Sequence, residues 1–178
     1  MKPAEYVSEE AMKGIPLKTG WLPWTKSCFV CGAQNPHGLH LRSRAETDRV
    51  ILDYTTREAD VGYRHIVHGG ILMTLMDEVM TWAAILAAQR ICVAAEMTTR
   101  LVLPVSAGEQ LRFEGMILRA SPRLLLAESQ VWTLDGDRLV AKASGKYAPM
   151  PSDQVKACAD DFITGPDTLP LDSLFQGI

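Results

Sequence analysis

The sequence predicts an α+β fold in which a long antiparallel sheet wraps around one central helix. The helix is indicated by a single segment, residues 69–89, that is dense in Ile, Leu, Met, Ala and Trp. The sheet is indicated by four β-like runs that follow this segment and are separated by short turn sequences. Consecutive strands joined by tight turns form antiparallel sheets, and an apolar helix beside such a sheet buries its surface against it.

Two terminal segments flank the predicted domain, which covers residues 28–149. Residues 1–27 show no sustained hydrophobic period and are punctuated by glycine and proline, so we expect an arm with one short helix at Glu9–Lys13. Prolines and glycines also mark residues 150–178 as a C-terminal tail. The apolar residues expected to dock these segments on the body are Trp21 and Trp24 in the arm and Leu169, Leu171, Leu174 and Phe175 in the tail.

Strands are predicted on both sides of the helix. Gly38–Ala45 and Arg49–Thr56 precede it and are joined by a tight turn. The helix over Gly69–Gln89 is about 30 Å long at ~1.5 Å per residue, and its apolar residues lie on nearly all sides, which is typical of a helix buried in its own domain. Asp77 and Glu78 argue against a membrane span, because each charge costs roughly 2.5–3.5 kcal/mol at a bilayer centre. The strands expected after the helix are Ile91–Val105, Glu109–Ala120, Leu124–Leu134 and Arg138–Ala148.

The composition limits the classes of function. The chain has 178 residues, of which 47% are hydrophobic and 22% charged, as in an ordinary single globular domain. The formal net charge of −3 argues against a dedicated nucleic-acid-binding protein, which normally carries a basic face. Four cysteines are too few for a disulfide scaffold, and the N-terminus shows no apolar signal segment. We therefore expect a cytoplasmic protein that binds neither nucleic acid nor membrane.

The start of the predicted helix carries the pattern that is most informative about chemistry. His68 is followed by Gly69 and Gly70, and glycines at a helix start let a ligand approach the backbone closely. The first N–H groups of a helix lack intrahelical partners and sit at the positive end of its dipole, so they can stabilise a developing oxyanion. Asp77, eight residues after Gly69, lies within about 80° of the same helix face. The hydroxyl of Thr81, one turn further, shares that face and can orient a water molecule.

These features resemble the hotdog-fold acyl-CoA thioesterases of the phenylacetate-degradation and 4-hydroxybenzoyl-CoA types. The resemblance extends from about Cys28 to Pro149 and includes the order of the strands. An upstream cysteine motif is similar to that of one subgroup of the superfamily. The residues that carry the resemblance are His68-Gly69-Gly70, Asp77, Leu103-Pro104-Val105 with Gly108-Glu109, and upstream Cys28-Phe29-Val30-Cys31-Gly32 with Asn35-Pro36 and Gly38-Leu39.

The resemblance implies hydrolysis of an acyl-CoA thioester by attack of water. In this interpretation the backbone N–H of Gly69, with that of Gly70, polarises the thioester carbonyl, and Asp77 acts as the general base or as the nucleophile. His68 helps to fix the thioester or the leaving thiol. No metal and no bound cofactor is implied, because coenzyme A is part of the substrate. Such enzymes are homodimers or homotetramers with sites at the subunit interface, so Asp77 is expected to face the Gly69 end of another chain.

The sequence departs from the family's pattern at two positions. Many relatives carry Ser or Thr ten residues before the proline, where this chain has Ala94, and several carry Asn six residues before the His, where it has Gly62. Thr81 is the expected substitute for the missing hydroxyl. The residues expected to bind substrate are Arg64 for the coenzyme A phosphates, Met73 and Trp82 for the acyl group, and Glu96 and Thr98 on the strand face of Ala94. Two alternatives stay open: a non-catalytic acyl-CoA-binding protein, and an enoyl-thioester hydratase or dehydratase on the same fold.

The cysteine motif allows more than one interpretation. Cys28 and Cys31, followed by His37 and His40, have a spacing compatible with a zinc site, with a redox pair or with a small buried turn. A structural zinc site usually joins two separate elements, whereas these four residues lie within thirteen positions. The pattern therefore favours the turn.

Overall fold

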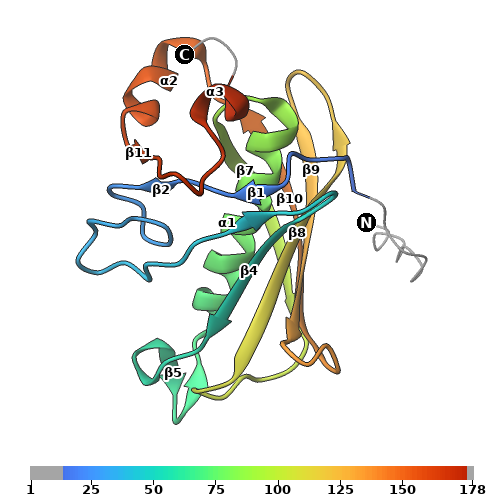
Figure 1. The fold of residues 1–178 in the computed structure, drawn as a ribbon. Helices are drawn as coiled ribbons and strands as arrows, with labels where there is room; N and C mark the ends of the chain where they lie inside the picture. The colour runs from blue at the N-terminus through green and yellow to red at the C-terminus, as the bar shows by residue number, and fades with distance from the viewer. Residues whose placement is uncertain (1–13, 176–178) are drawn as a thin grey trace.

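A long antiparallel sheet wraps around one helix in the computed structural model, which describes residues 14–175 (Figure 1). The main sheet has seven strands in the order β1-β3-β4-β8-β9-β10-β7, and each neighbouring pair is antiparallel. The α+β architecture predicted from the sequence is thereby confirmed. The strands are β1 Gly20–Trp21, β3 Arg44–Ala45, β4 Val50–Thr55, β7 Cys92–Leu101, β8 Gln110–Ala120, β9 Leu125–Thr133 and β10 Leu139–Pro149.

The central helix, α1, covers Gly69–Ala88 and ends where Gln89 adopts a left-handed conformation with φ 50°. By length and composition α1 could cross a membrane, but most of it is buried inside the protein. It approaches the sheet closely at Gly115 of β8, where an added Cβ would lie 2.6 Å from the backbone carbonyl of Val79. The sheet therefore packs closely around the helix and buries the nearly continuous apolar surface of α1.

The four strands after the helix are confirmed, and the strand predicted at Arg49–Thr56 is confirmed as β4, whereas the rest of the segment before the helix differs from the expectation. Of the strand predicted at 38–45, only Arg44–Ala45 is β3, because His40 has φ 53° and interrupts the extended backbone. A short 3-10 helix (Glu58–Asp60) and a small hairpin precede α1 instead. The hairpin consists of β5 (Val61–Tyr63) and β6 (Ile66–Val67).

The two terminal segments meet beside the C-terminal half of α1 (Figure 1). Strand β2 (Trp24–Thr25) pairs with β11 (Phe162–Ile163), and the helices α2 (Ser152–Ala159) and α3 (Leu171–Leu174) lie at the same end. The expected docking of the tail is confirmed, since Leu174 and Phe175 are buried.

The N-terminal arm is attached differently from the expectation. Trp21 remains 41% exposed, under the guanidinium of Arg42 at 5.0 Å, whereas Trp24 is half-buried. The arm is held by the pairing of β1 with β3 and of β2 with β11. The short helix expected at Glu9–Lys13 lies outside the described residues.

Candidate functional site

His68 caps the N-terminus of α1 with its side chain. Its backbone is extended (φ −62°, ψ 128°), and its Nδ1 accepts a hydrogen bond from the Gly70 N–H at 2.9 Å. Two glycines make room for the imidazole, because a Cβ added at Gly62 or at Gly70 would lie 2.8 Å from a ring atom of His68. Any larger side chain at position 62 would therefore collide with this ring.

Only one of the two glycine N–H groups expected at the oxyanion position is available. The Gly70 N–H is bonded to His68, whereas the N–H of Gly69 has no hydrogen-bond partner among the described residues. Gly69 packs closely against β7, since a Cβ added there would lie 2.6 Å from Leu101 Cδ1. The unpaired donor at the positive end of the helix dipole is thus that of Gly69.

Asp77 lies two turns further along the same ridge of α1, on which Gly69, Met73, Asp77 and Thr81 follow one another at intervals of four. The Tyr147 hydroxyl donates a hydrogen bond to Asp77 Oδ1 at 2.8 Å, and Thr81 also interacts with this phenol. Burial, and then the charge of Asp77, raise the pKa of Tyr147. The phenol is therefore held as a protonated donor, which leaves Oδ2 of Asp77 for another partner.

A β-bulge places Tyr147 opposite Ala94, where the resemblance of the sequence implied a missing hydroxyl. The pairing of β10 with β7 slips between Lys146 and Tyr147, so Ala95 has no partner and Tyr147 lies across from Ala94. Bulges redirect side chains in this way. Tyr147 carries no distinguishing signal in the sequence, because on a strand of alternating residues it looks like an ordinary core aromatic.

The same bulge overturns the prediction that Glu96 and Thr98 share the strand face of Ala94. One extra residue reverses the alternation of side chains between the two faces. Glu96 pairs with Lys146 on the face turned away from α1, with 2.7 Å between Nζ and Oε2. Thr98 lies opposite the exposed Ser144 on that outer face.

Trp82 also differs from its predicted role. It is buried, and its Nε1 donates a hydrogen bond to Glu78 Oε1 at 2.9 Å, so it belongs to the core and does not line an open acyl pocket. Met73, by contrast, is 40% exposed on the ridge between Gly69 and Asp77. Of the two apolar residues predicted to contact an acyl group, Met73 alone is accessible.

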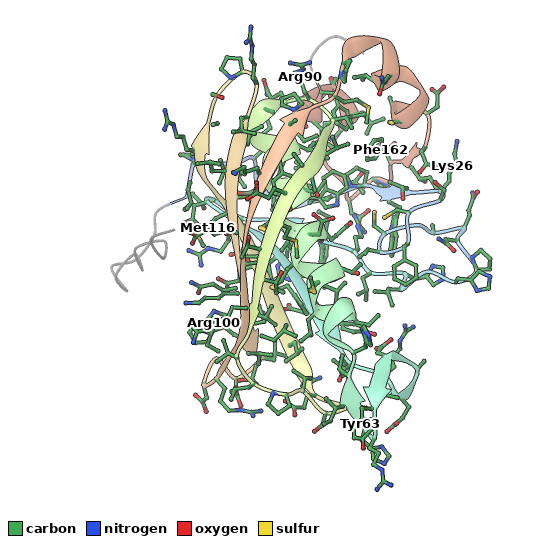
Figure 2. The ribbon with its side chains drawn as sticks, turned by 180° about the vertical axis from the view of Figure 1, so that it is seen from behind. Lys26, Tyr63, Arg90, Arg100, Met116 and Phe162 are labelled. Atoms are coloured by element: carbon green, nitrogen blue, oxygen red, sulfur yellow. The ribbon has the colours of Figure 1, made fainter. Side chains whose placement is uncertain are left out.

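An open cleft of about 390 Å³ lies beside Gly69. Arg64 stands nearby at the turn of the β5–β6 hairpin, exposed and with φ 35°, and it joins none of the ion pairs of the described residues. Figure 2 shows its neighbour Tyr63 projecting at the end of the molecule opposite Arg90. The residues that line the cleft are Ile66, Val67, Gly69, Leu72, Leu101, Val102, Leu103, Pro104 and Val105.

The loop before α1 is anchored by Asp60, a buried residue that the sequence did not reveal. Its carboxylate accepts hydrogen bonds from the Arg57 backbone N–H and from Arg57 Nη2, both at 2.8 Å, and from the Tyr54 hydroxyl. Its backbone carbonyl accepts the N–H of His68 at 2.8 Å. Burial alone would raise the pKa of Asp60, but the hydrogen bonds from Arg57 and Tyr54 outweigh burial and hold the pKa below its ordinary value.

We expect Asp60→Asn to lower the free energy of unfolding by about 1–3 kcal/mol near pH 7, because the buried donors lose a charged acceptor. Since the native pKa is lowered, the ionised carboxylate stabilises the fold above its ordinary pKa of about 3.9, and this contribution is lost as pH falls through the native value. Urea unfolding near pH 7 and near pH 3 measures both effects. The difference from the wild type should shrink at acid pH, and a difference that stays constant would contradict the prediction. Asp137, which is exposed and joins none of the ion pairs of the described residues, is the control, since Asp137→Asn should cost less than about 0.5 kcal/mol.

The cysteine motif forms a turn whose thiols meet a carboxylate from α1. The Gly32 N–H donates to the Cys28 carbonyl at 3.0 Å, and the Sγ atoms of Cys28 and Cys31 and one oxygen of Glu78 lie within 4.8 Å of one another. A hydrogen bond from the Cys31 thiol lowers the pKa of Cys28 to about 6, whereas burial raises that of Glu78 to about 7. The two histidines of the motif, His37 and His40, are exposed and stand outside this cluster.

A family model matches the central part of the chain. Residues 65–140, from the hairpin through β9 to the start of β10, match the model of the thioesterase superfamily. A search of curated proteins found no match to the chain.

Solved structures share the fold at low sequence identity. The Escherichia coli PaaI protein of the phenylacetic acid degradation operon is 18% identical, with a TM-score of 0.59 over 64% of this chain and 81% of that one. Zebrafish thioesterase superfamily member 2 is 18% identical, with a TM-score of 0.60 over 66% and 90% of the two chains. The Streptococcus mutans protein smu.793, solved with acetyl-CoA bound, is 18% identical, with a TM-score of 0.57 over 62% and 88%. The sheet wrapped around α1 is therefore the hotdog fold, and residues 65–140 carry the signature of the thioesterase superfamily, as the resemblance of the sequence had predicted.

Proposed function

We propose that this protein hydrolyses an acyl-CoA thioester by attack of water. The observation that carries the proposal is that the unpaired Gly69 N–H, which adjoins an open cleft, and the carboxylate of Asp77 lie on one ridge of α1. The thioesterase superfamily match supports the reaction class, and the acetyl-CoA bound to the S. mutans neighbour supports the substrate class.

The site is proposed to be shared between two subunits. Gly69 and Asp77 are about 12 Å apart along the helix, too far for both to contact one thioester carbonyl. Strand β7 pairs with β10 and, among the described residues, with no strand on its other side. Its Val93 and Leu101 are 45% and 49% exposed, and an unpaired apolar edge strand is a template for pairing with another chain. In the proposed homodimer two β7 strands pair, so that Asp77 of one subunit faces Gly69 of the other.

The proposed reaction follows from these positions. The thioester carbonyl oxygen accepts a hydrogen bond from the Gly69 N–H. Asp77 Oδ2 removes a proton from a water molecule while the oxygen of that water bonds to the carbonyl carbon. The resulting oxyanion is stabilised by the same N–H and by the helix dipole. The carbon–sulfur bond then breaks, and the proton passes from Asp77 to the thiolate, which releases a carboxylic acid and free coenzyme A. His68, whose Nδ1 is already an acceptor, presents its Nε2–H to the thioester or to the departing sulfur.

Tyr147 supplies the hydroxyl that Ala94 lacks in this scheme. Its phenol lies opposite Ala94 and holds Asp77, with Thr81 beside it. The departure from the family's pattern at position 94 is therefore compatible with catalysis, which favours a hydrolase over the non-catalytic binding protein.

Tyr147→Phe should reduce kcat roughly 10–100-fold, because a hydrogen bond to a charged group contributes about 1.5–3 kcal/mol. KM should change little, since the phenol holds the base and is not proposed to touch the acyl group. Steady-state measurement of thiol release checks both parameters. Tyr63→Phe, at an exposed position, is the matched control. A rise in KM at constant kcat would show that Tyr147 does not position Asp77 for catalysis.

The proposed function is tested with a panel of short, long and aromatic acyl-CoA thioesters, followed by release of free thiol. Turnover of at least one member supports the hydrolase. Absence of turnover, with thermal stabilisation by an acyl-CoA, would indicate a binding protein instead. Consumption of an enoyl-CoA without thiol release would indicate a hydratase.

A further inference from the structure

The cluster of Cys28, Cys31 and Glu78 has no part in thioester hydrolysis as proposed above. Its ligand atoms lie within 4.8 Å of one another, and Cys28 Sγ is 3.9 Å from Glu78 Oε2. We propose that these three side chains bind one Zn²⁺ ion, with water as the fourth ligand. The site would join the N-terminal turn to the middle of α1, one residue beyond Asp77.

The spacing of the three side chains suits a tetrahedral zinc ion. Zinc binds sulfur at about 2.3 Å and carboxylate oxygen at about 2.0–2.2 Å, so neighbouring ligand atoms of a tetrahedron are roughly 3.5–3.8 Å apart. The observed separation of 3.9 Å between Cys28 Sγ and Glu78 Oε2 is close to this value. The other two separations are at most 4.8 Å, about 1 Å above the spacing that zinc requires.

The cysteine turn is already shaped to present its sulfur atoms. The Gly32 N–H closes the turn on the Cys28 carbonyl, and the Val30 N–H donates to Cys28 Sγ at 3.3 Å. The Thr25 hydroxyl, 3.6 Å from Cys31 Sγ, supports the second sulfur and also accepts the Cys28 N–H at 3.2 Å. Both sulfur atoms therefore have a neighbouring polar group that fixes their position before a metal binds.

The cluster contains three acidic groups and lacks a cation. Trp82 satisfies Oε1 of Glu78, while Oε2 faces the sulfur atoms. No ion pair in the described part of the chain includes Glu78. A carboxylate withdrawn from water is costly unless it is paired or coordinates a metal, and a divalent ion would offset two of the three negative charges of this carboxylate and the two thiolates.

The third ligand, Glu78, comes from a separate element of the fold, as a structural zinc site usually requires. The thirteen-residue spacing of the cysteines and histidines was too compact for a site that joins two elements, and the histidines are exposed. Glu78 comes instead from α1, fifty residues away in the chain. Two thiolates and one carboxylate favour zinc over hard cations such as Mg²⁺ or Ca²⁺, which take oxygen ligands alone.

Metal analysis of the whole protein, purified without chelators and then equilibrated with ZnSO₄ and desalted, tests the proposal. We expect about one zinc per chain, and a thiolate-to-cobalt absorption band when Co²⁺ replaces it. Glu78→Gln keeps the shape of the side chain and should weaken zinc binding at least about tenfold, and Cys28→Ser should weaken it further. Cys158→Ser and His40→Ala are the controls and should retain the metal. These measurements do not depend on thioester hydrolysis, so the zinc site can be refuted without refuting the proposed hydrolase, and the reverse.

Three results would overturn the zinc site. The first is protein that stays metal-free after equilibration while its thiols are reduced. The second is a Cys28–Cys31 disulfide found by mass spectrometry in the folded protein, which would assign the pair to redox chemistry. The third is loss of zinc in His40→Ala with full retention in Glu78→Gln, which would identify the histidines as the ligands. If a cysteine variant fails to fold, zinc binding by Glu78→Gln and the cobalt spectrum of the wild type still test the site.

Discussion

Asp77→Asn should reduce thioester hydrolysis by about 10²–10⁴-fold, the range over which a positioned general base contributes. An amide has nearly the same shape as the carboxylate but does not accept the proton of water. The amide oxygen of the variant can still accept the hydrogen bond that Tyr147 donates, at 2.8 Å in the wild type, so the fold should change little. Thiol release from the best acyl-CoA of the panel measures the loss of activity. A melting temperature within a few degrees of the wild type shows that the loss is chemical.

A second carboxylate variant provides the comparison. Asp135 is exposed in the turn between β9 and β10, and its carboxylate is hydrogen-bonded to Thr133 and Asp137 beside it, so Asp135→Asn should keep full activity. If Asp77→Asn retained activity within about twofold of the wild type, Asp77 could not be the base, since even weak general-base catalysis exceeds that factor.

Gly69→Pro should lower kcat/KM about 10²–10³-fold, the cost of losing one oxyanion donor. Gly69 is the first residue of α1 after its cap, and proline is well tolerated at this position because its missing N–H has no intrahelical partner. The substitution therefore deletes the proposed donor while the helix is kept. Gly69→Ala retains the N–H and adds only a Cβ near the movable end of Leu101, so its loss should be much smaller. Equal losses in the two variants would show that the added bulk, and not the missing N–H, is responsible.

Mixing these two inactive proteins, Gly69→Pro and Asp77→Asn, tests whether the site is shared. In a two-fold dimer that combines one subunit of each, one site carries both changes and the other carries neither. Random exchange of subunits should thus restore about a quarter of the wild-type activity. If each site were built within one chain, mixing would restore nothing.

The elements of the fold that could be predicted are those specified by local patterns. Residues 69–89 and the four runs after them have strong periodicity and clear turn signals, and α1 with β7, β8, β9 and β10 followed as expected. The β5–β6 hairpin was missed because its turn, Arg64-His65, adopts φ values of 35° and 64° without the glycine or asparagine that normally marks such a turn.

The parts of the candidate site that could not be predicted depend on contacts between distant segments. The face of Glu96 was wrongly predicted because a bulge is a property of two paired strands, and neither strand alone shows it. Tyr147 meets Asp77 across seventy residues of sequence, and Cys28 meets Glu78 across fifty. Periodicity describes which way a side chain points along its own element, and it contains no information on which element will face it.

The pairing of β2 with β11 has a consequence for the order in which the chain folds. Residues 24–25 cannot find their partners until residues 162–163 have been synthesised, which takes roughly 10–30 s at typical rates of translation. During this interval the following cysteine turn lacks the strand that secures it, and the ring of Trp82 lacks its contact with Phe162. The pairing of β2 with β11 and the contact of Trp82 with Phe162 are therefore among the last contacts that the chain can form as it is synthesised.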